Sequence, residues 1–265
     1  MSEKVVLVDR EDGLAIVTLN RPQARNALNG ELRAVLRDSM AALAADDGVG
    51  VVILTGADPA FCAGLDLKEL GSGDRQQVAD ATGAGADPDR PMRPWAPLGK
   101  PLIGAVNGVA VTGGFELALN CDFLIASDRA RFADTHSRVG VMPGWGLTVL
   151  LPEAIGLRRA REMSATGNFL DAQTALAWGL VNHVVAHDRL LVKARELARD
   201  ILGNDADGVR RIYETYAAVR QATPAERAAT ETRMAREWSA RGLDAGEIER
   251  RRAAIQARGR AQSQG

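Results

Sequence analysis

Two short segments of the chain combine glycine with small residues shortly after apolar runs. The first is FCAGLDL (Phe61–Leu67), which follows the run VVILTG, and the second is VTGGFELA (Val111–Ala118). Glycine and small residues let the backbone turn sharply and approach a ligand closely. A helix that starts around Leu65–Asp66, at the turn of the first segment, leaves free N–H groups. Two such donors that meet at one point form an oxyanion hole. Either loop alone is weak evidence for such a site, because glycine-rich strand-to-helix turns are common and most are merely structural.

The two thiols, Cys62 and Cys121, match no metal-ligand spacing and are typical of reduced cysteines in a cytoplasmic protein. Cys62 lies beside the first glycine loop, but a nucleophilic thiol needs a partner base, so we expect Cys62 to serve packing. The N-terminus MSEKVVLVDR lacks the apolar core of a signal peptide. The longest apolar stretch, Pro101–Phe115, is shorter than the ~20 residues that cross a bilayer. We therefore expect a cytoplasmic protein.

The elements that must position these loops follow from hydrophobic patterning. Asp12-Gly13 between two strand-like runs predicts a hairpin of Val5–Asp9 with Leu14–Leu19. Asn29 is a candidate N-cap for a helix over Gly30–Ala45, with an apolar stripe along one face. The run Val51–Gly56 does not alternate and predicts a strand buried on both faces. Two further apolar strands are predicted over Pro101–Gly108 and Phe123–Ser127. A helix is predicted over Arg189–Leu202, and a long helical tail starts at Pro224.

The strand, glycine loop and helix recur along the first part of the chain, whereas helical patterns dominate the rest. We predict a core over residues 1–200 and a C-terminal helical region over residues 201–265. Residues 71–94 are rich in Gly, Asp, Ala and Pro and contribute little to a core. This segment is either a surface loop or a mobile cover over a substrate channel.

The charge of the chain is balanced. It has 33 basic and 34 acidic residues in 265, for a net charge of −1. No overall basic field exists that would hold nucleic acid or anionic lipid by charge alone, so we expect neither nucleic acid nor membrane as a partner. A chain of this length can bury a sizeable core without disulfides or metals.

Several motifs together resemble the crotonase superfamily, specifically its enoyl-CoA hydratase branch. They occur in order from the first strand to about Val185: NRPQARNAL, GADPAFCAGLDLKEL, KPLIGAVNGVAVTGGFELALNCDFLIAS, FADTHSRVGVMPGWG and ALAWGLVNHVV. The resemblance implies an α/β fold, a superhelix of repeated ββα units with a C-terminal helical trimerisation region. It also implies an acyl-CoA thioester substrate, a homotrimer or dimer of trimers, and no metal or organic cofactor, since coenzyme A is part of the substrate. The candidate contact residues on the C-terminal helices are Tyr213, Tyr216, Met234 and Trp238.

By motif position, the resemblance assigns the oxyanion hole to the backbone amides of Leu65 and Gly113, which agrees with the two glycine loops. A family glutamate follows the GG motif, and here it is Glu116. Its neighbours Phe115 and Leu117 are apolar, so the carboxylate should be desolvated and suited to acid–base catalysis. The alternative is a carboxylate that only complements the helix dipole.

The second family glutamate is missing. Its position, four residues before Gly140, is occupied by His136. Histidine changes charge near neutral pH, so His136 could activate water, protonate carbon, be inert, or serve a different reaction. Asp134 is a weaker candidate that points to the same side as His136 if the segment is extended.

The phosphates of coenzyme A require cationic partners. The resemblance places Arg25, Ala63 and Lys68 at the CoA site, with ordinary surface charge as the alternative for Arg25 and Lys68. Met142 to Trp145 shape the turn after His136, and packing is the expected role of Trp145.

The sequence thus predicts an enoyl-CoA hydratase that adds water to a trans-2-enoyl-CoA thioester through Glu116 and His136. Two alternatives remain open. One is another crotonase reaction on acyl-CoA, namely isomerisation, decarboxylation or thioester hydrolysis, because these share the oxyanion hole. The other is an acyl-CoA-binding protein with weakened catalysis.

Overall fold

The computed structural model describes residues 4–71, 93–242 and 245–263. The chain divides into two compact units, Met1–Ala206 and Asp207–Gly265. The division predicted from the sequence, after residue 200, lies inside helix α9 (Leu190–Leu202). The predicted cover segment, residues 71–94, falls outside the described residues except at its ends.

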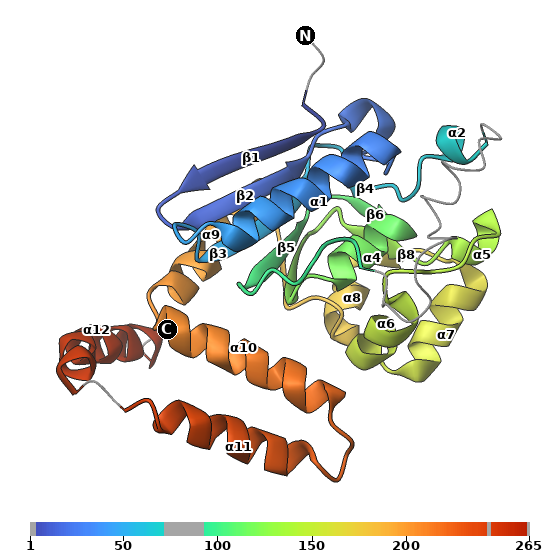
Figure 1. The fold of residues 1–265 in the computed structure, drawn as a ribbon. Coiled ribbons are helices and arrows are strands. Elements are labelled where there is room, and N and C mark those ends of the chain that lie inside the picture. The colour runs from blue at the N-terminus through green and yellow to red at the C-terminus, as the bar shows by residue number, and fades with distance from the viewer. Residues whose placement is uncertain (1–3, 72–92, 243–244, 264–265) are drawn as a thin grey trace. The chain divides into compact units, whose positions relative to one another are not determined.

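A six-stranded sheet in the order β1-β2-β3-β5-β7-β10 lies at the centre of the first unit (Figure 1). The β1–β2 pair is antiparallel and every other neighbouring pair is parallel. The predicted hairpin is confirmed at its turn, where Asp12 and Gly13 have φ of 44° and 82°, as a two-residue hairpin turn requires. The strands are β1 (Val6–Glu11), β2 (Leu14–Leu19), β3 (Val51–Gly56), β5 (Leu102–Val106), β7 (Phe123–Ser127) and β10 (His183–Val185).

A second sheet has the order β4-β6-β8-β9. Its strands are β4 (Ala60–Cys62), β6 (Val109–Val111), β8 (Arg131–Ala133) and β9 (Leu170–Asp171). Each turn of the chain gives one strand to each sheet and then a short helix: α2 (Leu67–Leu70), α4 (Gly113–Leu119) or α5 (His136–Val139). The pairs β4–β6 and β6–β8 are parallel, as are β3–β5 and β5–β7. The predicted superhelix of repeated ββα units is therefore confirmed.

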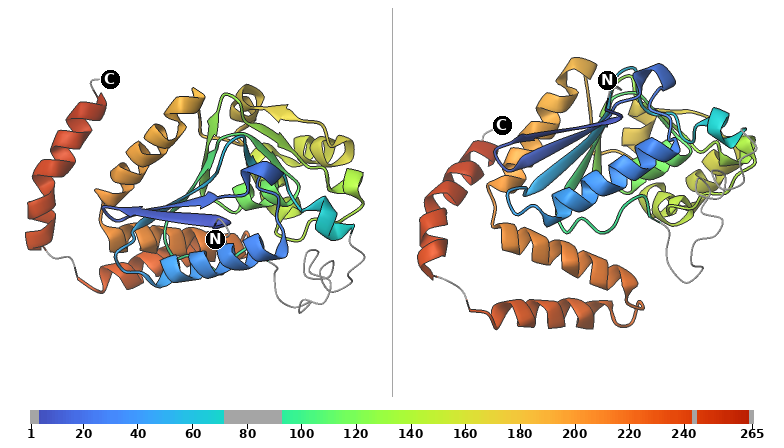
Figure 2. Two further views of the ribbon diagram at one scale, coloured as in Figure 1. Left: turned by 90° about the horizontal axis from the view of Figure 1, so that it is seen from above. Right: turned by 45° about the horizontal axis from the view of Figure 1, so that its top comes forward.

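Helices cover both faces of the large sheet (Figure 2). Val52 and Leu54 of β3 belong to the same core cluster as the apolar stripe of α1 (Gly30–Ala45). Val51 and Ile53 belong to the opposite cluster with α9. Since all six residues of β3 are buried, the absence of alternation in its sequence is explained. The predicted α1 is confirmed with its cap, as the Asn29 side chain accepts a hydrogen bond from the Leu32 amide.

A polar cluster joins the loops at the C-terminal ends of four parallel strands. The His187 ring lies 3.1 Å from Ser127 Oγ on one side and 3.1 Å from Asp58 Oδ2 on the other. Asn107 donates to Asp58 Oδ1 at 2.9 Å. The remaining elements of this unit are η1 (Pro22–Ala24), α6 (Leu147–Ile155), α7 (Leu157–Thr166), α8 (Ala172–Trp178) and η2 (His187–Arg189).

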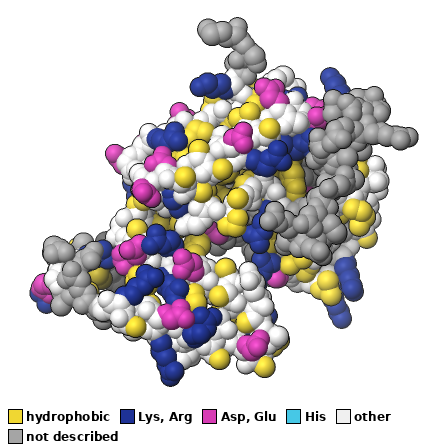
Figure 3. All heavy atoms as spheres, viewed as in Figure 1, with side chains coloured by type: hydrophobic (Ala, Val, Ile, Leu, Met, Phe, Trp, Pro, Cys, Tyr) yellow, Lys and Arg dark blue, Asp and Glu magenta, His cyan; other side chains and the backbone are white. Residues whose placement is uncertain are grey.

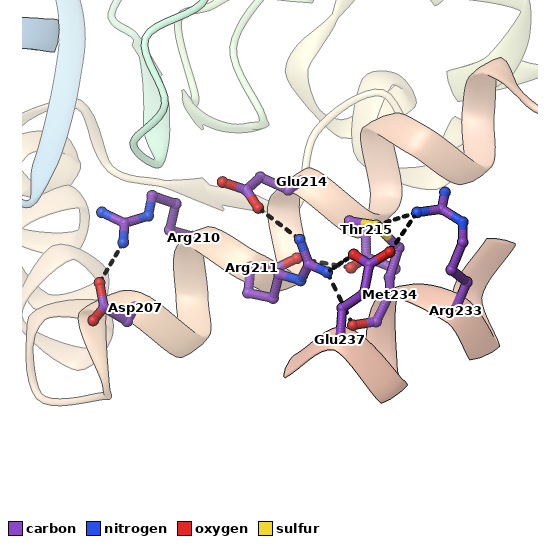
Figure 4. A network of polar contacts seen from close by, with 8 residues as sticks. All are labelled: Asp207, Arg210, Arg211, Glu214, Thr215, Arg233, Met234 and Glu237. Carbon is purple, nitrogen blue, oxygen red and sulfur yellow. Dashed lines mark hydrogen bonds and ion pairs between the residues drawn. The ribbon is translucent and has the colours of Figure 1, made fainter. Parts of the chain in front are cut away.

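Three helices follow α9: α10 (Ala206–Gln221), α11 (Arg227–Ser239) and α12 (Ala245–Ser263). Arg211 joins α10 to α11, because it donates to Met234 O at 3.0 Å and to Glu237 Oε2 at 2.7 Å (Figure 4). Basic and acidic side chains are interspersed on the face shown in Figure 3, in keeping with the balanced charge. In the described part of the chain, no helix combines the length and hydropathy that a bilayer crossing needs.

Candidate active site

The two glycine loops meet in direct backbone contact. They follow β4 and β6, which are parallel neighbours. A Cβ on Gly64, where φ is +85°, would lie 2.9 Å from Val111 O, and a Cβ on Gly114 would lie 2.2 Å from Cys62 O. Because no side chain fits at either position, glycine is what lets the loops approach. The sequence alone left this convergence open.

The amides of Leu65 and Gly113 are available as donors for two different reasons. Leu28 donates to Gly64 O at 2.7 Å and accepts from Asp66 N at 3.1 Å, and this parallel bridge directs the Leu65 amide away from Leu28. Gly113 is the first residue of α4, so its amide has no helical acceptor. Within the described residues neither amide donates to a protein group.

One local expectation is corrected here. A helix was predicted to start at Leu65–Asp66, whereas α2 begins at Leu67 with Asp66 as its cap. The Leu65 amide is therefore freed by the bridge with Leu28 and not by a helix terminus. The two donor residues lie close together, since a Cβ on Gly113 would be 4.0 Å from Leu65 Cδ2.

Glu116 lies in α4 with 3% of its surface exposed, so the expected desolvation of its carboxylate is confirmed. Oε1 accepts hydrogen bonds from the amides of Trp145 at 2.7 Å and Leu147 at 3.4 Å. Trp145 packs against the main core, and its carbonyl accepts from Asn120 at 2.8 Å. The carboxylate thus fixes the start of α6 and keeps Oε2 for other contacts.

His136 faces the second oxygen of Glu116. It is 4% exposed, and its Nε2 lies 3.5 Å from Glu116 Oε2. On its other side, Nδ1 lies 2.6 Å from Asp134 Oδ1, which also accepts from the His136 amide at 3.1 Å. Asp134 and His136 do not lie on an extended strand, because the chain turns into α5 after Thr135. We call these three residues the Asp134–His136–Glu116 triad.

The triad sets the charge of the imidazole. Burial lowers the pKa of His136, but hydrogen bonds and charge from Asp134 and Glu116 outweigh burial and raise it to about 9. Burial acts to raise the pKa of Asp134, yet the net shift is downward because His136 and the Ser164 side chain hydrogen-bond to its carboxylate. The imidazole is therefore protonated at neutral pH. Burial raises the pKa of Cys62 to about 12, which leaves a thiol without nucleophilic character.

Of the three predicted CoA contacts, Ala63 lies in the first glycine loop, Arg25 lies beside this loop and Lys68 follows it. The Ala63 amide donates to Arg25 O at 3.0 Å, so these two residues are brought together. The side chains of Arg25 and Lys68 are exposed, and Lys68 lies in α2. Sequence reasoning missed Arg21, which bridges Asp66 at 3.0 Å and fixes the entry to α2. It also underrated Asp134, whose two-residue spacing from His136 was the available signal.

Known proteins match most of the chain. The enoyl-CoA hydratase/isomerase family matches residues 9–245. A probable peroxisomal enoyl-CoA hydratase 1 from Arabidopsis thaliana is 43% identical over 80% of this chain and 78% of its own length. A crotonyl-CoA hydratase from Syntrophomonas wolfei is 35% identical over 79% and 80%.

Among solved structures, an enoyl-CoA hydratase from Mycobacterium smegmatis superposes with a TM-score of 0.73. It is 48% identical and covers 89% of this chain and 98% of its own. The ββα superhelix, the two glycine loops and the length of these matches lead to the same assignment. The chain belongs to the enoyl-CoA hydratase/isomerase family.

Proposed function

We propose that this protein is an enoyl-CoA hydratase, which adds water across the C2–C3 double bond of a trans-2-enoyl-CoA thioester. One juxtaposition carries the proposal. The amide of Gly113 and the carboxylate of Glu116 lie on the same short helix, and the amide of Leu65 lies on the adjacent loop. Two amide donors that can bind an oxyanion, and one carboxylate that can act in acid–base catalysis, are therefore within reach of one small substrate group.

The chemistry of hydration assigns a role to each group. A hydroxyl forms a bond to C3, and the displaced π pair develops as charge on the thioester oxygen. The amides of Leu65 and Gly113 stabilise this enolate oxygen, and one such donor is typically worth about 3 kcal/mol. Glu116 and His136 together remove a proton from water and deliver a proton to C2. Base, acid and oxyanion donors all come from the chain, so the proposal includes no metal or organic cofactor.

Coenzyme A is assigned to the first glycine loop. Arg25 and Lys68 present exposed cations, which suit the phosphates of the ligand. Ala63 contributes backbone contact beside Arg25. The proposal further includes a homotrimer or a dimer of trimers in the cytoplasm. The location is supported by the two buried free thiols, Cys62 and Cys121, which suit a reducing compartment.

Turnover of crotonyl-CoA, followed by loss of the conjugated enoyl absorbance and by product mass, tests the proposal. We expect 3-hydroxybutyryl-CoA to accumulate. A parallel binding measurement with saturated butyryl-CoA separates the alternatives. Tight binding without turnover indicates an acyl-CoA-binding protein. With suitable acyl-CoA substrates, release of free thiol indicates thioester hydrolysis, release of carbon dioxide indicates decarboxylation, and a shifted double bond in the product indicates isomerisation.

A further inference from the structure

The Asp134–His136–Glu116 triad is held so that only one imidazole nitrogen faces the site. Both the His136 amide and Nδ1 donate to the same oxygen of Asp134. Since a carboxylate is an acceptor, Nδ1 carries a proton. Nε2 is then the nitrogen directed at Glu116. Asp134 thereby fixes both the orientation and the protonated nitrogen of the ring.

Glu116 is held with the matching geometry. Its Oε1 is occupied by the amides of Trp145 and Leu147, so Oε2 is the oxygen that faces His136. The side chains of His136, Glu116 and Asp134 are each 5% exposed or less. From the described elements packed around the imidazole, α4 contributes Glu116, the turn after β8 contributes Asp134, and α7 contributes the uncharged Ser164 behind Asp134.

From this geometry we infer that Asp134 is a positioning residue which makes His136 the proton donor to C2, while Glu116 is the base that activates water. The inference rests on the proposed hydration. In a merely structural interpretation, the Asp134 carboxylate would only accept the first amide of α5 and would have no effect on the imidazole. The two readings differ in what the charge of Asp134 does.

The proton steps balance with these roles. Glu116 takes a proton from water as the hydroxyl bonds to C3, and the π pair passes to the thioester oxygen held by Leu65 and Gly113. The enolate pair then takes the Nε2 proton of His136 to form the new C2–H bond, and the thioester carbonyl is restored. Finally, the proton on Glu116 passes to Nε2 across the 3.5 Å contact. The net change is the addition of one water, and both side chains return to their starting state.

The donor role fixes the sign of the pH dependence. An imidazolium is required, so kcat falls as the pH rises through the pKa of His136, about 9. A histidine acting as base at its ordinary pKa would instead lose activity as the pH drops through about 6.5. In Asp134→Asn the charge that supports the imidazolium is removed while the side chain keeps its size. We expect its alkaline limb to move to lower pH by at least one unit, kcat to fall at least ~10-fold, and KM to change little.

Three measurements test the inference. The chain has only three histidines, so a ¹³C-histidine NMR titration of the free wild-type protein, with His136→Gln for assignment, reads the charge of His136 directly. The kcat profiles of wild type and Asp134→Asn give the shift of the limb. A double variant, Asp134→Asn with His136→Gln, should lose no more activity than His136→Gln alone, because Asp134 acts only through His136.

The chain supplies a matched control. Asp58 and His187 form a second aspartate–histidine pair at 3.1 Å, in the polar cluster with Ser127 and Asn107. Asp58→Asn should leave kcat and its alkaline limb unchanged.

Three results overturn the inference: titration of wild-type His136 near 6.5, an Asp134→Asn variant with an unmoved limb, or a further loss in the double variant. The titration of His136 remains a valid test even if the Asp134→Asn variant does not fold, because it is measured on the wild-type protein. A wild-type protein whose His136 titrates near 9, but which hydrates no enoyl-CoA, instead refutes the proposed function and with it the donor role.

Discussion

The side chain of Glu116 has an observed structural contact and a proposed catalytic role, and a single substitution can separate the two. A glutamine at this position retains an oxygen that accepts from the Trp145 and Leu147 amides, but it cannot take a proton from water. We expect Glu116→Gln to lower kcat on crotonyl-CoA by ~10²–10⁴ with little change in acyl-CoA affinity or in the unfolding midpoint. Steady-state kinetics, calorimetric binding and thermal unfolding measure the three quantities. Retention of most activity would remove Glu116 from the mechanism.

The proposed oxyanion hole is tested through the backbone at Gly113. Gly113→Pro deletes the N–H and should lower kcat/KM by ~10²-fold or more. Gly113→Ala is its steric control, because it keeps the amide and must only displace Leu28 Cδ1, which would lie 3.1 Å from the new Cβ. Leu65→Ala also keeps its amide and should be mild. Equal losses in all three variants would show that side-chain packing, and not amide donation, governs this loop.

At the residue scale, the sequence predicts Glu116 and His136 as site residues but does not predict their contacts. The motif placed both residues, because each sits at a fixed distance from a glycine. The Asp134 contact depends on the turn at Thr135, and an extended segment would have given a different geometry. The Leu65 amide is free because Leu65 pairs with Leu28 in a parallel bridge. These two residues lie too far apart in the sequence for local patterning to predict the pair.

At the scale of elements, prediction succeeded where a long pattern and a local signal agreed. Helix α1 has the predicted bounds because the Asn29 cap and the apolar stripe specify the same start. Strands β3 and β7 were found as apolar runs. The three-residue strands β4, β6 and β8 and the four-residue helix α5 were missed, since periodicity needs more residues to show. The missed strands belong to the second sheet, and the missed helix α5 begins at His136. The elements that the sequence did not predict are therefore the ones that build the site.

The α1 cap gives a prediction about stability. Asn29→Ala removes the acceptor for the Leu32 amide at 3.0 Å and should lower the free energy of unfolding by about 1 kcal/mol. Asn29→Asp, which keeps an accepting oxygen, should lie within a few tenths of a kcal/mol of wild type. Urea denaturation of the three proteins measures both values. Equal stability of the Ala and Asp variants would mean that the cap hydrogen bond contributes nothing.

At the scale of the whole molecule, the C-terminal helices leave apolar surface that a partner copy would cover. The sequence suggested Tyr213, Tyr216, Met234 and Trp238 as contact residues. Met234 is corrected, because it is 7% exposed within its own chain. Ile212 is 56% exposed and Tyr216 is 73% exposed, and they lie one helical turn apart on α10. They are better candidates for contact.

Assembly is therefore expected to depend on this face of α10. Sedimentation of the wild-type protein should show trimers or hexamers, and Ile212→Glu with Tyr216→Glu should shift the distribution toward smaller species. Val192→Glu is the control, since Val192 is 44% exposed but lies on α9. A wild-type sample that sediments as an active monomer at low concentration would contradict the proposed trimer.

The hydrogen bonds from Trp145 and Leu147 to Glu116 have a consequence for reading related sequences. Folding alone favours an acceptor at position 116, because without one the two amides that begin α6 lose their partner. A lineage that abandoned catalysis would still be selected for glutamate or glutamine there. Asp134 likewise accepts from the first amide of α5 and from the Ser164 side chain of α7. Among the described residues, the side chain of His136 pairs with the carboxylates of Asp134 and Glu116 and supports no helix start. Divergence of chemistry within this fold should therefore be recorded at position 136 well before it is recorded at position 116 or 134.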